Sequence, residues 1–159
     1  MEFIRTPDDR FKNLLDYPFK PNYVDVDDTE GGKLRMHFVD EGPKDGQTVV
    51  MIHGNPTWSY MWRKLIPVLV SNGYRAVAID HIGAGRSDKP TKMGDYTIAR
   101  HEAWVKQALL KRSVLKTRTL FCMIGAELSG FAPSLIIRTR SVPSSCRIRV
   151  WHTEIPTKL

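Results

Sequence analysis

The sequence predicts an α/β protein with a mostly parallel sheet and flanking helices. Three short, largely apolar runs carry this prediction, at residues 48–52, 74–79 and 119–122. Runs of this kind are typical of strands buried on both faces of a parallel sheet. Two segments with helical spacing of apolar residues, 59–70 and 96–110, separate the three runs. The order strand, helix, strand, helix, strand implies parallel strands joined by right-handed crossovers.

The segment before the first apolar run has a different pattern. Residues 1–22 are rich in charged, aromatic and proline residues, and we expect an extended arm. Short alternating stretches at 23–26 and 34–39 predict two half-buried strands, because a strand with one solvated face alternates apolar and polar residues. The turn-rich residues 41–47 predict a loop that leads into the first buried strand.

The first predicted helix contains a proline and is followed by a glycine. Pro67 lies within residues 59–70, and a proline inside a helix removes a hydrogen bond and clashes with the preceding turn. We therefore expect a kink or a late break at this residue. Asn72 and Gly73 mark the end of the helix, since both are typical of residues just past a helix C-terminus.

The length and composition are those of one ordinary globular domain. A chain of 159 residues is long enough to bury a core. No apolar run approaches the ~20 residues of a membrane span. The N-terminal residues mix acidic and basic side chains and lack the apolar segment of a signal peptide. We therefore expect no membrane association, and a cytoplasmic location follows as the default.

The formal net charge is +7, but the excess of basic residues is scattered along the chain. No zinc-finger spacing, RNA-binding signature or helix-turn-helix pattern accompanies it, so we expect no nucleic-acid partner. The two cysteines, Cys122 and Cys146, form no C-x-x-C pair and no metal-ligand spacing. They indicate a buried thiol and an incidental one rather than a disulfide or a metal site. Nothing in the sequence calls for a cofactor.

Two loops follow the first two buried strands, where ligands bind in sheets of this kind. Residues 53–63 read HGNPTWSYMWR, and residues 80–90 read DHIGAGRSDKP. Gly83 and Gly85 in the second loop form a G-x-G pattern. Without a third glycine or a following Lys-Ser/Thr pair, this pattern is a weak indication of a phosphate-binding loop.

Residues 1–122 resemble the N-terminal half of a haloalkane dehalogenase, a member of the α/β-hydrolase superfamily. The resemblance rests on IRTPDDRF and YPFKPNY in the arm, HGNPTWSYMWRKLIPVL after the first buried strand, and the GxGRSDKP loop followed by DYT. A His-Gly loop and a G-x-G-x-S-D loop alone indicate only an α/β-hydrolase. The continuation Asn-Pro-Thr-Trp-Ser-Tyr is more specific, because the related epoxide hydrolases usually carry an aromatic residue where Asn55 stands.

The resemblance implies a reaction and a set of site residues. An aspartate would displace halide from a small halogenated hydrocarbon, and a water activated by a histidine would hydrolyse the resulting ester. The side-chain amide of Asn55 would bind the leaving halide, and its backbone N–H would serve the oxyanion hole. His53, Gly54 and Pro56 would support this loop, with His53 ordering it rather than acting as the base.

Four other residues of the two loops have structural interpretations. We expect Trp58 and Trp62 to pack in the core or against a cap rather than to bind halide. Asp88 lies in the SDKP turn and is expected to stabilise the loop. Arg86 is expected either to pair with Asp88 or to be solvated.

The resemblance ends after Cys122. In the family, the third buried strand leads into an aspartate within Asp-Trp-Gly-Gly, whereas no aspartate occurs in this chain after Asp95. Codons compatible with residues 123–127, when each is read from its third base, encode Asp-Trp-Gly-Gly. Codons compatible with residues 135–139, read in the same way, can encode Asp-His-Pro-Asp. A one-base deletion near Cys122 in the coding DNA accounts for both observations.

We therefore expect two regions. Residues 1–122 would form the N-terminal half of an α/β-hydrolase core, and residues 123–159 a non-family tail that is out of frame and poorly ordered. The fold would be an incomplete α/β-hydrolase without its cap domain. No catalytic residue would be retained, and the chain would be inactive. Exposed sheet edges predict a monomer or an aggregation-prone species. Two alternatives stay open, namely another α/β-hydrolase such as an epoxide hydrolase, and a non-catalytic binding protein.

Overall fold

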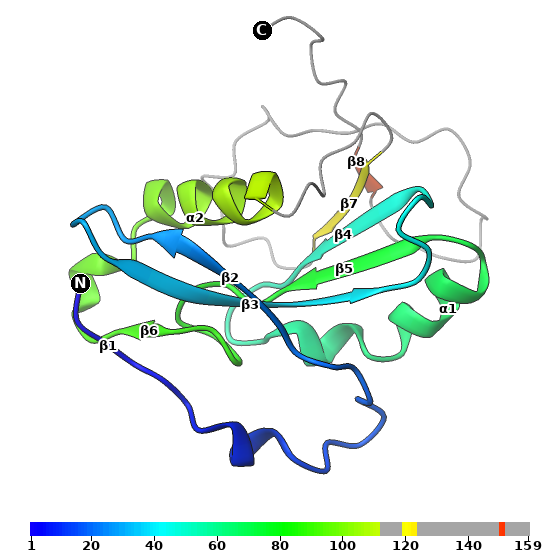
Figure 1. Cartoon of the computed structure of the whole chain (residues 1–159), viewed down its shortest axis with the longest axis horizontal. Helices are drawn as coiled ribbons and strands as arrows, with labels where there is room; N and C mark the ends of the chain where they lie inside the picture. The colour runs from blue at the N-terminus through cyan, green and yellow to red at the C-terminus, as the bar shows by residue number, and fades with distance from the viewer. Residues whose placement is uncertain (112–118, 124–149, 152–159) are drawn as a thin grey trace, which may run out of the picture.

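A computed structural model describes residues 1–111, 119–123 and 150–151. Its main body is a six-stranded sheet with the order β2-β3-β5-β4-β7-β8, and a second sheet pairs β1 with β6 (Figure 1). The strands are β1 Phe3–Ile4, β2 Asn22–Asp27, β3 Lys33–Glu41, β4 Thr48–Ile52, β5 Arg75–Ile79, β6 Lys89–Pro90, β7 Thr119–Met123 and β8 Val150–Trp151. The helices are α1 Leu65–Ser71 and α2 Ile98–Lys111, with 3₁₀ turns at Asp8–Phe11, Ser59–Trp62 and Met93–Asp95.

The three strands predicted from apolar runs lie side by side and parallel. β4 pairs with β5 on one side and with β7 on the other, so that Ile52 is beside both Ile79 and Met123. The chain passes from β4 through α1 to β5, and reaches β7 by way of α2. The predicted parallel core is therefore confirmed, and the carboxyl ends of these three strands meet at one edge of the sheet.

The outer strands are antiparallel, which makes the sheet as a whole mixed. β2 pairs with β3, and β3 with β5, in antiparallel fashion. The two alternating stretches of the sequence are therefore strands, as predicted, and both extend beyond the predicted bounds. β8 adds a short antiparallel neighbour to β7, with Trp151 opposite Phe121. The sequence did not predict this last strand.

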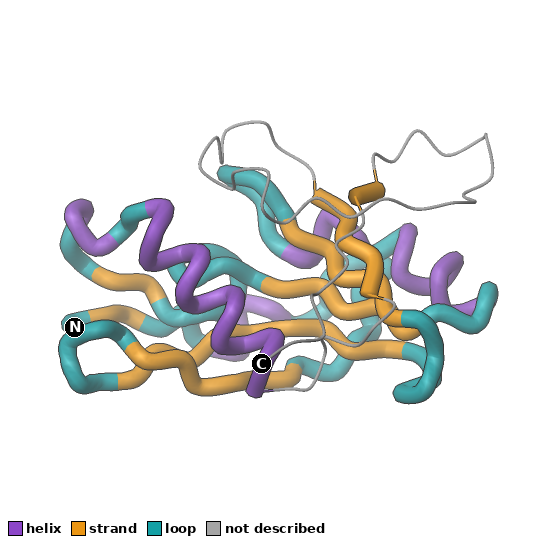
Figure 2. The backbone as a smooth tube through the Cα atoms, turned by 90° about the horizontal axis from the view of Figure 1, so that it is seen from above, coloured by secondary structure: helices purple, strands orange, loops and turns teal. Residues whose placement is uncertain are grey.

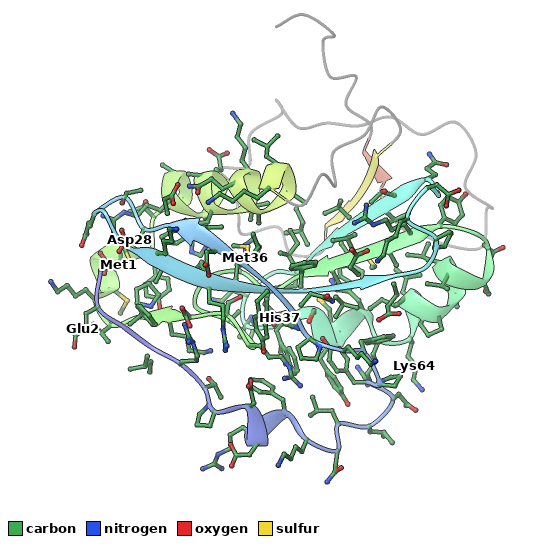
Figure 3. The ribbon with its side chains drawn as sticks, viewed as in Figure 1. Met1, Glu2, Asp28, Met36, His37 and Lys64 are labelled. Carbon is green, nitrogen blue, oxygen red and sulfur yellow. The ribbon has the colours of Figure 1, made fainter. Side chains whose placement is uncertain are left out.

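The sheet is covered on both faces. Met36 and His37 are neighbours on β3 and point to opposite faces (Figure 3). Met36 belongs to a buried apolar cluster that includes Trp104 of α2, and a second cluster on the other face includes Ile66 of α1. Seen from above, α2 lies toward one end of the sheet and α1 toward the other (Figure 2). Both helices are therefore held by apolar burial against the strands.

The single helix predicted over 59–70 is wrong. The segment forms a 3₁₀ turn at Ser59–Trp62 and then a separate helix, α1, that begins at Leu65. Pro67 is the third residue of α1, where backbone N–H groups have no partner within the helix. The proline therefore sits in the first turn of a new helix and produces neither a kink nor a late break.

The N-terminal arm passes on the side of the sheet opposite to α2 (Figure 1). It is extended in part, as predicted, but it also contains a 3₁₀ turn and the strand β1. β1 pairs antiparallel with β6, with Phe3 opposite Pro90. Farther along the arm, the Tyr17 hydroxyl and Ser59 share a buried hydrogen bond of 2.7 Å. The arm is thus attached to both loops that follow the buried strands.

Most of the predicted tail lies outside the described residues. Of residues 123–159, the structure describes Met123 at the end of β7 and the two residues of β8. Cys146 also lies outside this part of the chain. Within the described ranges, neither helix has the length and apolar character that crossing a membrane requires.

Truncation of the largest buried side chain tests the packing of α2. Trp104 is fully buried, and its indole N–H donates to the Asp27 carbonyl oxygen at 3.1 Å. We expect Trp104→Ala to lower the free energy of unfolding in urea by about 3–5 kcal/mol, because it leaves a cavity and an unpaired carbonyl. Leu110→Ala, on the exposed side of the same helix, should change it by less than about 0.5 kcal/mol. Equal losses for the two variants would contradict the packing described here.

Candidate functional site

A pocket of about 700 Å³ opens beyond the carboxyl ends of β4 and β5. Residues 53–58 form one wall and residues 81–85 another, while residues 96–98 and His101, at the start of α2, contribute a third. The two loops predicted to bind a ligand are thus brought together. Their proximity follows from the parallel pairing of β4 and β5, which delivers both strand ends to the same edge.

Asp80 is the buried carboxylate that joins these walls. It follows β5 directly and is completely buried. Its Oδ1 accepts the backbone N–H of Ser59 at 2.7 Å, and its Oδ2 accepts the backbone N–H of Arg86 at 2.9 Å and His37 Nδ1–H at 2.8 Å. Burial acts to raise the pKa of Asp80, but the hydrogen bonds from His37, Arg86 and Ser59 hold it below its ordinary value. The carboxylate is therefore ionised and acts as a fixed acceptor.

Ser87 and Gly85 complete the contacts around Asp80. The Ser87 hydroxyl donates to the Asp80 carbonyl oxygen at 2.7 Å and accepts the backbone N–H of His37 at 2.9 Å. Gly85 has φ +47°, and a Cβ atom there would lie 2.2 Å from Asp80 Oδ2. Gly83 has φ +98° and lies against the Tyr96 ring. The G-x-G pattern is thus explained by the close contacts of Gly85 with Asp80 and of Gly83 with Tyr96, and by the positive φ of both glycines. It does not require a bound phosphate.

His53 is buried, and its two ring nitrogens have different partners. Its Nδ1 lies 3.0 Å from the Gly54 carbonyl oxygen, and its Nε2 lies 3.0 Å from the backbone nitrogen of His81. A carbonyl only accepts and an amide N–H only donates, so Nδ1 carries the proton and Nε2 is the acceptor. Burial lowers the pKa of His53, which favours this neutral form. His53 thereby links the two loops.

His81 lies between two other histidines in the pocket wall. Its ring centroid is 4.7 Å from that of His53 and 5.5 Å from that of His101, both edge to face. Burial, together with the neighbouring His53 and His101, lowers the pKa of His81 to about 3. Neither of its ring nitrogens has a hydrogen-bond partner in the described part of the chain. Burial also lowers the pKa of His101.

Asn55 lies in the pocket with an exposed side chain. It follows β4 by three residues, and its peptide bond to Pro56 is cis. No hydrogen bond to its side chain occurs among the described residues, so the amide donors are available to a ligand. β7 pairs directly with β4, so the last residue of β7, Met123, lies at the same edge of the sheet. The structure places Asn55 in the pocket wall, and its role in halide binding stays a prediction.

The two tryptophans of the first loop pack against other side chains. Trp62 is buried in the apolar cluster on the α1 face. Trp58 contacts Phe11 edge to face at 5.5 Å and stacks on Tyr60 at 5.5 Å, and it also lines the pocket. The predicted packing is thus observed, with a part of Trp58 open to the pocket.

The predicted pairing of Arg86 with Asp88 is wrong. Asp88 receives two hydrogen bonds from Arg5 of the arm, at 2.6 and 2.8 Å, and one from the backbone N–H of Arg35 at 2.7 Å. Arg86 is not solvated either, because it is 9% exposed and its guanidinium lies 4.5 Å from the Phe11 ring centroid. The N-terminal arm, which is distant in sequence, supplies Arg5 as the partner of Asp88 and Phe11 as the ring beside Arg86. The loop-stabilising carboxylate predicted at Asp88 is present.

Sequence reasoning missed Asp80, His37 and His81. A charged residue directly after a continuous apolar strand was a usable signal for Asp80, since such a position is buried and needs partners. No local pattern marks His37 as its partner, because the two residues are 43 positions apart. Within the described ranges, no group of three or more His, Cys, Asp or Glu side chains is placed to hold a metal ion.

Comparisons with known proteins give the same fold. The sequence profile of the α/β-hydrolase fold family matches residues 47–120. The chain is 52% identical over 130 residues to a haloalkane dehalogenase of Mycobacterium marinum, and 43% identical over 157 residues to one of Psychrobacter cryohalolentis. A solved tetrameric haloalkane dehalogenase from Paraglaciecola agarilytica is 40% identical, with a TM-score of 0.73.

The matched lengths differ greatly between this chain and its relatives. The two sequence matches cover 82% and 99% of this chain, but 43% and 50% of the relatives. The structural match covers 84% of this chain and 44% of the other protein. The chain therefore spans about half the length of the proteins to which it is similar.

Removal of the Asp80 carboxylate tests its role in joining the loops. We expect Asp80→Ala to lower the free energy of unfolding by about 3–5 kcal/mol, because it leaves three buried donors without an acceptor. Asp45→Asn, at an exposed loop position, should leave it within about 0.5 kcal/mol of the original. Urea unfolding followed by tryptophan fluorescence measures both. A loss below about 1 kcal/mol for Asp80→Ala would show that the loops do not depend on this carboxylate.

The buried neutral histidine His81 predicts instability in acid. Its folded pKa is about 3 against 6.5 in the unfolded chain, so the unfolded state binds more protons on acidification. The burial of His81 therefore does not reduce the free energy of unfolding above about pH 6.5, where the ring is neutral in both states. The free energy of unfolding decreases as the pH falls from 6.5 toward 3. We expect His81→Gln to flatten the fall in melting temperature between pH 7 and pH 4. Melting curves whose pH profiles run parallel in the two proteins would contradict this assignment.

Proposed function

We propose that the pocket of this chain, which has the α/β-hydrolase fold and is similar to the haloalkane dehalogenases, is the halide-binding half of a dehalogenase site. The family reaction would be hydrolysis of a carbon–halogen bond in a small halogenated hydrocarbon, through an aspartyl ester and without a cofactor. The amide of Asn55 would donate to the leaving halide, and its backbone N–H to the oxyanion of the ester. His53, Gly54 and Pro56 would hold the loop in place.

The position of Asn55 carries this proposal. Its exposed amide has no partner in the described part of the chain and lines the pocket. β7 pairs in parallel with β4, so its last residue, Met123, lies at the edge of the sheet from which the loop with Asn55 leaves. A carboxylate at that point and an amide donor across from it are the two groups that a displacement with halide departure requires.

We further propose that the 159-residue chain is inactive. No aspartate follows β7, since the last aspartate in the chain is Asp95. Loss of a covalent nucleophile lowers the rate by several orders of magnitude. The family's base and cap have no recognisable counterpart in residues 123–159 either. The alternative reading of the codons, which yields Asp-Trp-Gly-Gly from the third base of the Met123 codon onward, supports a one-base deletion as the cause and an out-of-frame tail from residue 123 onward.

Two other functions are compatible with the fold. Epoxide hydrolases use the same aspartate chemistry, but Asn55 counts against them because they usually carry an aromatic residue there. A non-catalytic binding protein would use the same pocket, and its ligands would raise the melting temperature of the chain as written. A cytoplasmic location, a monomeric or aggregation-prone state and the absence of a nucleic-acid partner stay predictions from composition and charge.

Restoration of the reading frame tests the proposed function. Insertion of one base between the codons of Cys122 and Met123 should yield a protein that releases halide from short 1-haloalkanes. The 159-residue chain should release none above a heat-killed control. Halide release by the unrestored chain would refute its proposed inactivity, and an inactive but folded restored protein would refute the dehalogenase function.

A substitution in the restored protein assigns the role of Asn55. We expect Asn55→Ala to lower kcat for halide release about 100-fold or more, because it removes a donor aimed at developing negative charge. Asn72→Ala, at the C-terminus of α1 and away from the pocket, is the matched control and should keep normal rates. Equal activities of the Asn55 and Asn72 variants would remove the main support for the halide site.

A further inference from the structure

β2 is the outermost strand on one side of the described sheet. Among the described strands it pairs with β3 alone. In an antiparallel pair, every second residue turns its N–H and C=O toward the partner strand, and the residues between turn theirs outward. The outward residues include Asp25 and Asp27, because their backbone groups bind side chains of α2. Outward backbone groups of this kind are a template on which a further extended segment can pair.

Three side chains of α2 occupy these outward groups. The Trp104 indole N–H donates to the Asp27 carbonyl oxygen at 3.1 Å, and Gln107 Oε1 accepts the Asp27 N–H at 2.9 Å. The Lys111 ammonium donates to the Asp25 carbonyl oxygen at 3.0 Å. Three of the four outward backbone groups of the two aspartates are therefore bound.

The spacing of the three side chains on α2 explains their reach. They are separated by three and four residues, which places them along one side of a helix. α2 packs over β2 (Figure 1). Trp104 is fully buried, whereas Gln107 is half-buried and Lys111 is exposed. A paired strand lies about 4.8 Å from its neighbour, so these side chains occupy space that a further strand would need.

The charged side chains of β2 add a second barrier. Asp25 and Asp27 are both exposed, and Lys111 Nζ lies 3.7 Å from Asp27 Oδ1. Antiparallel pairing of β2 with β2 of a second copy would bring the aspartates of both chains onto one short ladder, where like charges repel. Charged side chains on an edge strand are a common protection against edge-to-edge association.

We propose that Gln107 and Lys111 form an edge guard, which closes β2 against pairing with β2 of a second copy of this chain. Trp104 anchors the guard beside the strand, and the carboxylates of Asp25 and Asp27 repel a copy that approaches. The guard includes none of the residues that line the pocket, so the inference does not depend on the proposed halide site.

Hydrogen exchange of the ¹⁵N-labelled 159-residue chain, followed by nuclear magnetic resonance, tests whether the guard covers β2. The exchange rate of the Asp27 amide is measured relative to the amides of the central strand β4, which report overall stability. We expect Gln107→Ala to raise this relative rate about tenfold, because the amide loses its acceptor. Lys106→Ala, at an exposed position of the same helix, is the matched control and should leave it unchanged. An unchanged relative rate in Gln107→Ala would overturn the proposal.

Sedimentation velocity tests whether an open edge pairs. An open-edge variant carries Asp25→Thr, Asp27→Thr, Gln107→Ala and Lys111→Ala, and thus lacks both the guard and the repelling charges. We expect it to form dimers whose fraction rises with protein concentration. Use of Asp25→Pro in place of Asp25→Thr should abolish the dimers. Proline has no N–H with which to pair a new strand, and the backbone of residue 25 faces away from β3.

The matched control keeps both strand substitutions but carries Lys106→Ala and Leu110→Ala, at exposed positions of α2, in place of the guard substitutions. It should sediment as the original chain does. An open-edge variant that associates no more than this control, or dimers that persist with Asp25→Pro, would overturn the proposal. If the open-edge variant fails to fold, the exchange rates decide the matter. None of these measurements involves halide release, so their failure is distinct from a failure of the proposed function.

Discussion

The ionised carboxylate of Asp80 is the contact on which the arrangement of the pocket depends. It accepts hydrogen bonds from His37 on β3, from the backbone of Ser59 in one loop and from the backbone of Arg86 in the other. All of these groups are buried, so no water replaces the carboxylate if it moves. Because the acceptor follows β5 directly, the rigid central strands set the positions of both loops. The parallel pairing of β4 and β5 and this one carboxylate together define the pocket walls.

The same arrangement accounts for the neutral histidines at the site. His53 bridges the loops as a donor through Nδ1 and an acceptor through Nε2, which is possible only for an uncharged ring. His81 lies beside it, and its ring nitrogens have no hydrogen-bond partner among the residues that the structure describes. The wall formed by residues 53–58 carries the exposed side chain of Asn55.

Much of the framework could be predicted from local patterns. Continuous apolar runs identified the three parallel strands, and the loop with Asn55 indicated the similarity to haloalkane dehalogenases. The helix over 59–70 was predicted as one element because apolar spacing continues across the break, whereas the structure starts a new helix in which Pro67 occupies the first turn. The pairing of Arg86 with Asp88 was inferred from proximity in sequence. Arg5 replaces it because the arm crosses the loop.

The sequence by itself determined the strands, the amide at residue 55 and the lack of an aspartate after residue 95, because each of these is a matter of residue type and local period. Only the tertiary structure decided which carboxylate holds the loops, which tautomer His53 adopts and that His81 is buried against the pocket. Those features depend on contacts between residues that are tens of positions apart. Their hydrogen-bond partners and loss of solvent exist only once the sheet has brought the strand ends together.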